Sequence, residues 1–154
     1  MVGLGARPVI VVGYDGSQAS RAALGIAARH AGSSGVVFVV YAYDVPSDLL
    51  GSANSPRLLA DQESHGRALL DEVLVSNDGP LREVTYETAL LNGPAAPAIA
   101  GFARARNADE IIVGAQGFGR GPALGRVPYQ LLHIADRPVL VMPPFARQSA
   151  QPIA

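Results

Sequence analysis

The residues best suited to chemistry lie in a glycine-rich stretch that follows a short apolar run. The twelve residues from Gly114 to Gly125 include five glycines, and Arg120 and Arg126 lie in or directly behind the stretch. Glycines leave backbone N–H groups uncovered, so such a loop can form an anion-binding nest ahead of a helix N-terminus. The residues alone leave two interpretations open: a phosphate-binding loop, or a plain connection without a ligand.

A second candidate for chemistry is Asp15, in the segment Gly13-Tyr14-Asp15-Gly16-Ser17. A carboxylate there could accept hydrogen bonds from a ribose hydroxyl or help to hold a metal ion. The same residue is also typical of an Asp-Gly turn, where its charge suits the N-terminus of the following helix. Both interpretations stay open at this stage.

The composition excludes several classes of chemistry. All 12 basic residues are arginine, and 13 residues are acidic, which gives a net charge of -1. We therefore expect no general affinity for nucleic acid or anionic membrane. Without lysine there is no Walker A loop and no Schiff-base catalysis, and without cysteine there is no disulfide or thiol nucleophile. No apolar run approaches the ~20 residues of a membrane span, and residues 1–7 lack a signal-peptide pattern. We therefore predict a cytoplasmic protein.

Sequence motifs for other enzymes and for metal sites are missing. No window matches Gly-x-Gly-x-x-Gly or Gly-x-Ser-x-Gly, which removes the dinucleotide fingerprint and the nucleophile elbow. His30, His65 and His133 fall in three different predicted helices without ligand spacing, so we expect no protein-held metal. No nucleophile, base and orienting group come together, so the sequence does not favour an independent hydrolase.

Four short runs are continuously apolar and rich in β-branched residues, which is typical of strands buried on both faces of a parallel sheet. We expect these strands to position the candidate residues. These runs are Val9 to Val12, Val36 to Tyr41, Ile111 to Val113 and Val139 to Met142. A fifth run, Glu83 to Glu87, alternates polar and apolar residues and predicts an edge strand.

Helical patterns separate the strands. Ser17 and Gly32 suit the two ends of a helix over residues 18–31, and Ser55-Pro56 suits the start of a helix that runs to about Ser76. Further helices are expected over residues 95–106 and 129–135. The alternation predicts an open α/β domain, in which ligands bind beyond the carboxyl ends of the strands at the switch point of the sheet.

Four segments together resemble the universal stress protein family. The resemblance extends over essentially the whole stretch from Pro8 to Met142, and the spacing from the late glycine, Gly125, to the last strand is also similar to that of the family. The segments are Val11 to Ser17, Gly93 to Ile99, Ala108 to Gly117 and Arg137 to Val141.

The resemblance implies an architecture. The expected fold is a five-stranded parallel sheet of order 3-2-1-4-5 with helices on both faces, Rossmann-like, over residues 8–143, between tails at 1–7 and 144–154. It also implies a homodimer, for which the apolar and uncharged last strand, Val139 to Met142, offers a pairing edge.

One branch of this family binds ATP through Gly-x2-Gly-x9-Gly-Ser/Thr, with Mg²⁺ as an optional companion. Carried over to this chain, the resemblance implies that Asp15 and Ala42 contact the nucleoside. The full set implied to bind the nucleotide is Asp15, Ala42, Gly114, Gly117, Gly119, Gly125, Arg126 and Val127.

The chain departs from the ATP-binding motif at three points. Seven residues instead of nine separate Gly117 from Gly125, Arg126 replaces the Ser/Thr, and Pro128 removes a backbone donor from the start of the helix. Arg120 or Arg126 could compensate for the lost contacts by charge-assisted hydrogen bonds.

Two functional hypotheses follow. The first is a homodimeric stress-response domain that binds an adenine nucleotide such as ATP, hydrolyses it slowly at most, and senses or regulates through an unknown protein partner. The alternative is a dimeric protein-interaction module that has lost nucleotide binding. The segment from Gly117 to Gly125 separates the two.

Overall fold

Five strands and four α-helices alternate along the chain in the computed structural model, which describes residues 6–45, 47–75, 79–116 and 124–143. A single 3-10 turn, η1, is added within these ranges. The bounds are β1 Val9–Gly13, α1 Gln18–Ala31, β2 Val36–Tyr43, η1 Ser47–Leu49, α2 Ser55–Val75, β3 Thr85–Asn92, α3 Ala95–Ala105, β4 Glu110–Gly114, α4 Arg126–Ile134 and β5 Val139–Met142.

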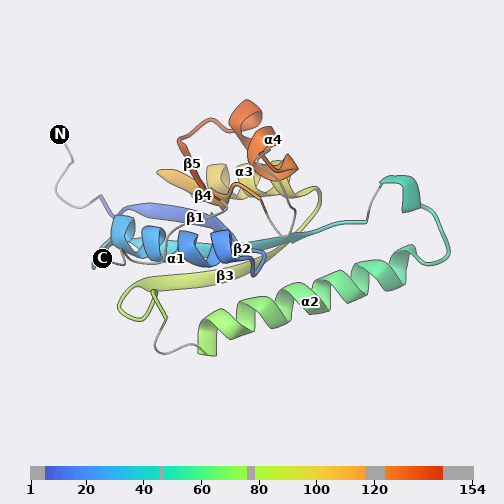
Figure 1. Cartoon of the computed structure of the whole chain (residues 1–154), viewed down its shortest axis with the longest axis horizontal. Helices are drawn as coiled ribbons and strands as arrows, with labels where there is room; N and C mark the ends of the chain where they lie inside the picture. The colour runs from blue at the N-terminus through green and yellow to red at the C-terminus, as the bar shows by residue number, and fades with distance from the viewer. Residues whose placement is uncertain (1–5, 46, 76–78, 117–123, 144–154) are drawn as a thin grey trace, which may run out of the picture.

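The strands form one parallel sheet in the order β3-β2-β1-β4-β5, as the resemblance implied (Figure 1). Val11 in β1 is paired with Phe38 of β2 and with Ile111 of β4, so β1 lies at the centre. The chain leaves β1 toward β2 on one side and later returns to β4 on the other. The carboxyl ends of β1 and β4 therefore flank the switch point, where a ligand crevice is expected.

Successive residues of the central strands supply two cores, one on each face of the sheet. Val12 and Val39 pack with α1 and α2, whereas their neighbours Val11 and Val40 pack with α3 and α4. All four valines have no exposed surface. This two-sided burial explains why the central strands are continuously apolar instead of alternating.

The helix α1 begins and ends where its cap residues predict. The Ser17 Oγ accepts a hydrogen bond from the Ser20 N–H at 3.2 Å, which satisfies one of the free donors of the first turn. At the other end, Gly32 has a φ of 61° and its N–H donates to the Ala28 carbonyl oxygen at 3.0 Å. The capping holds the loop between β1 and α1 in a defined position.

Two predicted boundaries are wrong by more than a residue or two. β3 extends to Asn92, because it pairs with β2 along its whole length, up to Tyr43. α4 begins at Arg126 instead of residue 129. Pro128 lies in the first turn of α4, where an N–H has no carbonyl partner within the helix, so proline is tolerated there.

The predicted tails lie mostly beyond the described residues, which begin at residue 6 and end at residue 143. Among the helices that are described, none is both long and apolar enough to cross a bilayer.

Candidate functional site

A cavity of about 250 Å³ lies at the carboxyl ends of β1 and β4, at the switch point of the sheet. Loops after both strands line it, together with the end of β2, the start of α3 and the first turn of α4. Gly117 and Gly119, both expected in the site, lie outside the described residues. The other six residues of the expected set all line the cavity: Asp15, Ala42, Gly114, Gly125, Arg126 and Val127.

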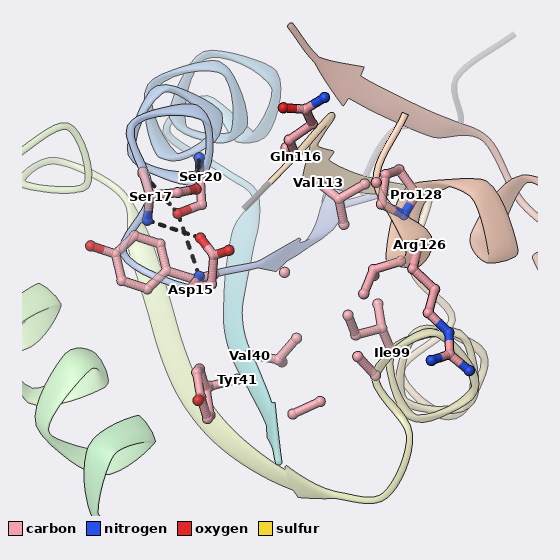
Figure 2. A pocket seen from close by; sticks show the side chains of 17 residues that line it. Asp15, Ser17, Ser20, Val40, Tyr41, Ile99, Val113, Gln116, Arg126 and Pro128 are labelled. Carbon is pink, nitrogen blue, oxygen red and sulfur yellow. Dashed lines mark hydrogen bonds between the residues drawn. The ribbon is translucent and has the colours of Figure 1, made fainter. Parts of the chain in front are cut away.

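Asp15 forms the turn into α1 and also borders the cavity (Figure 2). Its Oδ1 accepts a hydrogen bond from the Ser17 N–H at 2.9 Å, and its own N–H donates to the Ser20 Oγ at 3.4 Å. No described residue donates to Oδ2. The turn therefore uses one carboxylate oxygen and leaves the other for a ligand.

Two buried serines stabilise the turn that carries this carboxylate. Ser17 and Ser20 are 3% and 2% exposed, and the Ser20 Oγ donates to the Ser17 carbonyl oxygen at 3.0 Å. Both line the cavity. The sequence pointed to Ser17 as a helix cap but gave no role to Ser20, although its place three residues after the cap is where a cap hydrogen bond is expected.

Apolar side chains form another part of the lining. Figure 2 places Val40, Ile99 and Val113 around the same space, and all three are buried. They come from β2, α3 and β4, so three different elements build this surface. Sequence reasoning missed Ile99, because its position depends on how α3 packs across the sheet and no local pattern reports that.

At two positions of the lining, Gly114 and Gly125, neighbouring atoms lie so close that a Cβ would not fit without a shift. A Cβ at Gly114 would lie 2.8 Å from the Ala19 Cβ in α1, and one at Gly125 would lie 3.0 Å from the Ala115 carbonyl oxygen. The absence of side chains thus lets α1 and the start of α4 approach the end of β4. These glycines shape the cavity whatever it binds.

The first turn of α4 supplies the anion-binding potential of the cavity. The Gly125 N–H donates to the Ala115 carbonyl oxygen at 2.6 Å, and Pro128 has no N–H. The N–H groups of Arg126 and Val127 meet no backbone acceptor among the described residues. The helix therefore offers two of its first-turn donors, in addition to its positive dipole end.

Arg126 lines the cavity with its stem but not with its charge. The residue is exposed, and Figure 2 shows its guanidinium directed away from Asp15, toward α3. In this arrangement the Arg126 guanidinium therefore does not replace the contacts of the missing Ser/Thr, as the sequence suggested that it could. Arg120, the other arginine considered for that role, lies outside the described residues.

Two tyrosines that line the cavity feel both their burial and the charge of Asp15. Burial raises the pKa values of the Tyr14 and Tyr41 hydroxyls, and the nearby charge of Asp15 raises both further. Both phenols therefore stay neutral at physiological pH. Asp15 is the one acidic residue among the described residues that line the cavity, and no group of three metal-ligating side chains occurs in the described part of the chain.

Comparison with known proteins identifies relatives of this fold. A family model described as the universal stress protein family matches residues 7–143. A search of curated protein sequences finds no significant match.

Solved structures resemble the chain over most of its length. A universal stress protein in complex with cAMP is 25% identical, with a TM-score of 0.64 over 88% of this chain and 96% of that protein. A family member from Burkholderia pseudomallei is 25% identical, with a TM-score of 0.68 over 89% and 96%. The universal stress protein UspA from Lactobacillus plantarum is 22% identical, with a TM-score of 0.72 over 88% and 97%.

Proposed function

The chain belongs to the universal stress protein family, and from this premise we propose that its cavity binds an adenine nucleotide and that the domain senses or regulates in the stress response. The observation that carries the proposal is the convergence of the Asp15 carboxylate and the first turn of α4 on one cavity at the switch point. A relative of 25% identity was solved in complex with cAMP, which supports the choice of ligand. The proposed setting is the cytoplasm, a reducing compartment that requires no disulfides.

Each part of the nucleotide has a matching surface. Oδ2 of Asp15 accepts a hydrogen bond from a ribose hydroxyl, because Oδ1 is already held by the Ser17 N–H. The adenine ring packs near Ala42, against Val40 and Ile99. A phosphate lies at the start of α4, where the Arg126 and Val127 N–H groups donate to it. Gly114 and Gly125 keep this path open.

The same geometry weakens the case for a triphosphate such as ATP. Pro128 lacks a donor, the Gly125 N–H is already used, and the Arg126 charge points away from the cavity. We therefore propose that one phosphate is held better than three. Any Mg²⁺ that accompanies ATP would be held mainly by phosphate oxygens, because Asp15 is the single carboxylate of the described lining.

Isothermal titration calorimetry with ATP, AMP and cAMP tests the proposal. We expect binding of at least one of them by the unmodified protein. In Asp15→Ala the affinity falls about tenfold or more, because a hydrogen bond to a charged acceptor is lost. In Asp15→Asn the acceptor for the Ser17 N–H is kept, so this variant separates the ribose contact from the turn.

Asp61→Ala is the matched control, since Asp61 is exposed on α2 and does not line the cavity. Its affinities should equal those of the unmodified protein. Absence of heat with all three nucleotides at high protein concentration would refute nucleotide binding. The alternative, a dimeric interaction module without a nucleotide, would then stand.

An exposed apolar surface favours the dimer that both hypotheses include. Tyr129, Leu132 and Ile134 on α4 and Leu140 on β5 are all at least 36% exposed, although they are large and apolar. β5 is also an edge of the sheet in the described structure. We propose that two copies pair through β5 and its flanking α4 residues, which removes this surface from water.

A further inference from the structure

A second cavity, of about 190 Å³, lies between α1, the last turns of α2 and the segment that precedes β3. Tyr14 borders both this cavity and the nucleotide crevice. None of the residues proposed to contact the nucleotide lines this second cavity. Its lining includes the side chains of Tyr14, Arg21, Leu24, Glu72, Val73 and Leu81.

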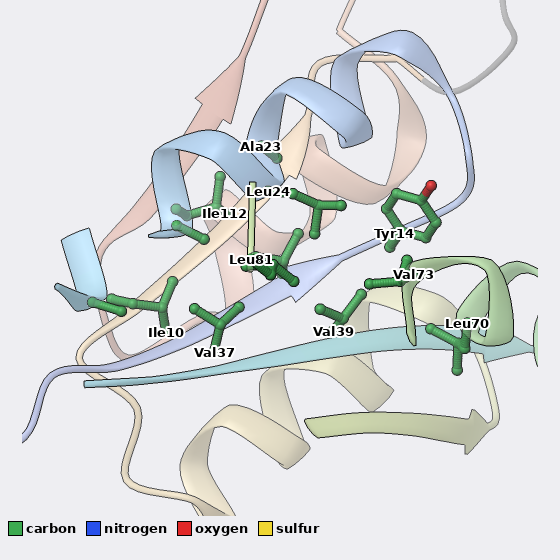
Figure 3. Close-up of a cluster of buried hydrophobic side chains, with 13 residues drawn as sticks. Ile10, Tyr14, Ala23, Leu24, Val37, Val39, Leu70, Val73, Leu81 and Ile112 are labelled. Atoms are coloured by element: carbon green, nitrogen blue, oxygen red, sulfur yellow. The ribbon is translucent and has the colours of Figure 1, made fainter. Parts of the chain in front are cut away.

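Tyr14 contributes a polar hydroxyl group to the lining residues of this cavity. The residue is 4% exposed, and no hydrogen bond to its hydroxyl is found among the described residues. Every fully buried side-chain nitrogen or oxygen in the described structure has a partner, so this unpartnered hydroxyl must reach open space. Figure 3 shows it directed out of the apolar cluster that holds the ring.

A cation and an anion flank this hydroxyl. Arg21 and Glu72 are exposed residues that line the same cavity as Tyr14. Burial raises the pKa of Tyr14, the Arg21 guanidinium lowers it and the Glu72 carboxylate raises it. In the described part of the chain, Arg21 and Glu72 form no ion pair with each other or with another residue. The Arg21 Nε donates to the Gly16 carbonyl oxygen at 3.0 Å, which leaves its two terminal nitrogens for a ligand.

The rest of the lining is apolar. Leu24, Val73 and Leu81 are each less than a tenth exposed and contribute to the core on the α1 and α2 face. The volume is below the ~300 Å³ at which pockets for drug-sized ligands begin. A fitting ligand is therefore small and carries an anionic group, a cationic group and a short apolar part.

We propose that this cavity is a second binding site, for a free aliphatic α-amino acid. The carboxylate of the ligand pairs with Arg21 and accepts a hydrogen bond from the Tyr14 hydroxyl. Its ammonium group pairs with Glu72, and its side chain packs against Leu24, Val73 and Leu81. The two protein charges then gain partners that they lack within the described chain.

Ligand-observed NMR and calorimetry on the full chain test the site, with L-leucine as the probe. Acetate and isopentylamine each carry one half of its charge pattern and serve as comparison ligands. We expect L-leucine to bind with a dissociation constant below about 10 mM, and each half-ligand to bind at least about tenfold more weakly. Acetate binding as tightly as L-leucine would overturn the proposal in favour of a simple anion site.

Two variants locate the site. Tyr14→Phe removes only the hydroxyl and keeps the ring in the core, and Glu72→Gln removes only the charge; each should weaken L-leucine binding about tenfold. Asp71→Asn is the matched control, because Asp71 is exposed one residue earlier on α2 and does not line the cavity. A circular dichroism melt confirms that each variant is folded.

Undetectable L-leucine binding at about 10 mM, or binding that neither variant changes, would overturn the assignment. Asp15→Asn, which keeps the acceptor for the Ser17 N–H, should leave L-leucine binding unchanged. Loss of nucleotide binding and loss of this second site are therefore distinguishable.

Discussion

Asp15 shows how one side chain can hold a turn and still be available to a ligand. Its Oδ1 accepts the Ser17 N–H at 2.9 Å, while Oδ2 has no hydrogen-bond partner among the described residues. Because the turn fixes the carboxylate, little side-chain freedom remains to be lost when a ribose binds. The two interpretations that the sequence left open for Asp15 are therefore compatible in one geometry.

The absence of a Cβ at Gly114 is needed both for the packing of the fold and for the shape of the cavity. Gly114→Ala places a Cβ 2.8 Å from the Ala19 Cβ, so α1 and β4 must move apart. We expect a loss of about 1–3 kcal/mol in the free energy of unfolding, the usual range for overpacking, measured by urea denaturation.

Gly101→Ala is the control for that substitution. Gly101 lies within α3, where a new Cβ meets no atom within 4 Å. Alanine there should leave stability unchanged or raise it by up to about 1 kcal/mol, because it reduces the entropy of the unfolded chain. Equal stability of Gly114→Ala and the unmodified protein would contradict the assigned packing role.

At the scale of single elements, we propose that the start of α4 determines how a phosphate is held. Pro128→Ala restores one N–H to the first turn. One added hydrogen bond should raise the affinity for ATP about three- to tenfold, while adenosine, which has no phosphate, should bind as before. Calorimetry with both ligands measures the difference.

Pro138→Ala, before β5, is the matched control, because Pro138 is exposed and does not line the crevice. An unchanged ATP affinity in Pro128→Ala, or an equal gain for adenosine, would show that the phosphate lies elsewhere.

Elements whose signal is local could be predicted from the sequence. Continuous apolar runs identified the strands β1, β2, β4 and β5. The cap residues Ser17 and Gly32 identified the ends of α1. β3 was placed too early, because its second half pairs with β2 and lacks the alternation that marks a strand with one wet face. The start of α4 lies three residues before the predicted residue 129, because the first turn of a helix tolerates Pro128.

The residues of the candidate site also fall into two groups, those with a local sequence signal and those without one. Loop residues at strand ends, such as Asp15 and Gly114, could be predicted because parallel topology brings strand ends together. Ile99, Ser20 and the direction of the Arg126 side chain depend on packing between distant elements. No pattern within a short window of sequence reports such packing.

At the scale of the whole molecule, the apolar surface on α4 and β5 is expected to define the dimer. Leu132, which is 54% exposed, should lie in the interface, so Leu132→Asp would place an unpaired charge there. We expect a dimer for the unmodified protein and a monomer for this variant by sedimentation equilibrium at micromolar concentration.

Leu50→Asp is the matched control, because Leu50 is 65% exposed on the segment before α2, away from α4 and β5. It should stay dimeric. A monomeric unmodified protein, or a dimer that Leu132→Asp leaves intact, would contradict an interface through this surface.

The central claim is that an adenine nucleotide occupies the crevice between β1 and β4. The most direct measurement is a titration of the ¹⁵N-labelled protein with AMP, followed by two-dimensional NMR of the backbone amides. We expect saturable shifts that concentrate at Asp15, Gly114, Arg126 and Val127, the described residues near which we place the sugar and the phosphate. An unchanged spectrum, or shifts confined to residues that do not line the crevice, would contradict it.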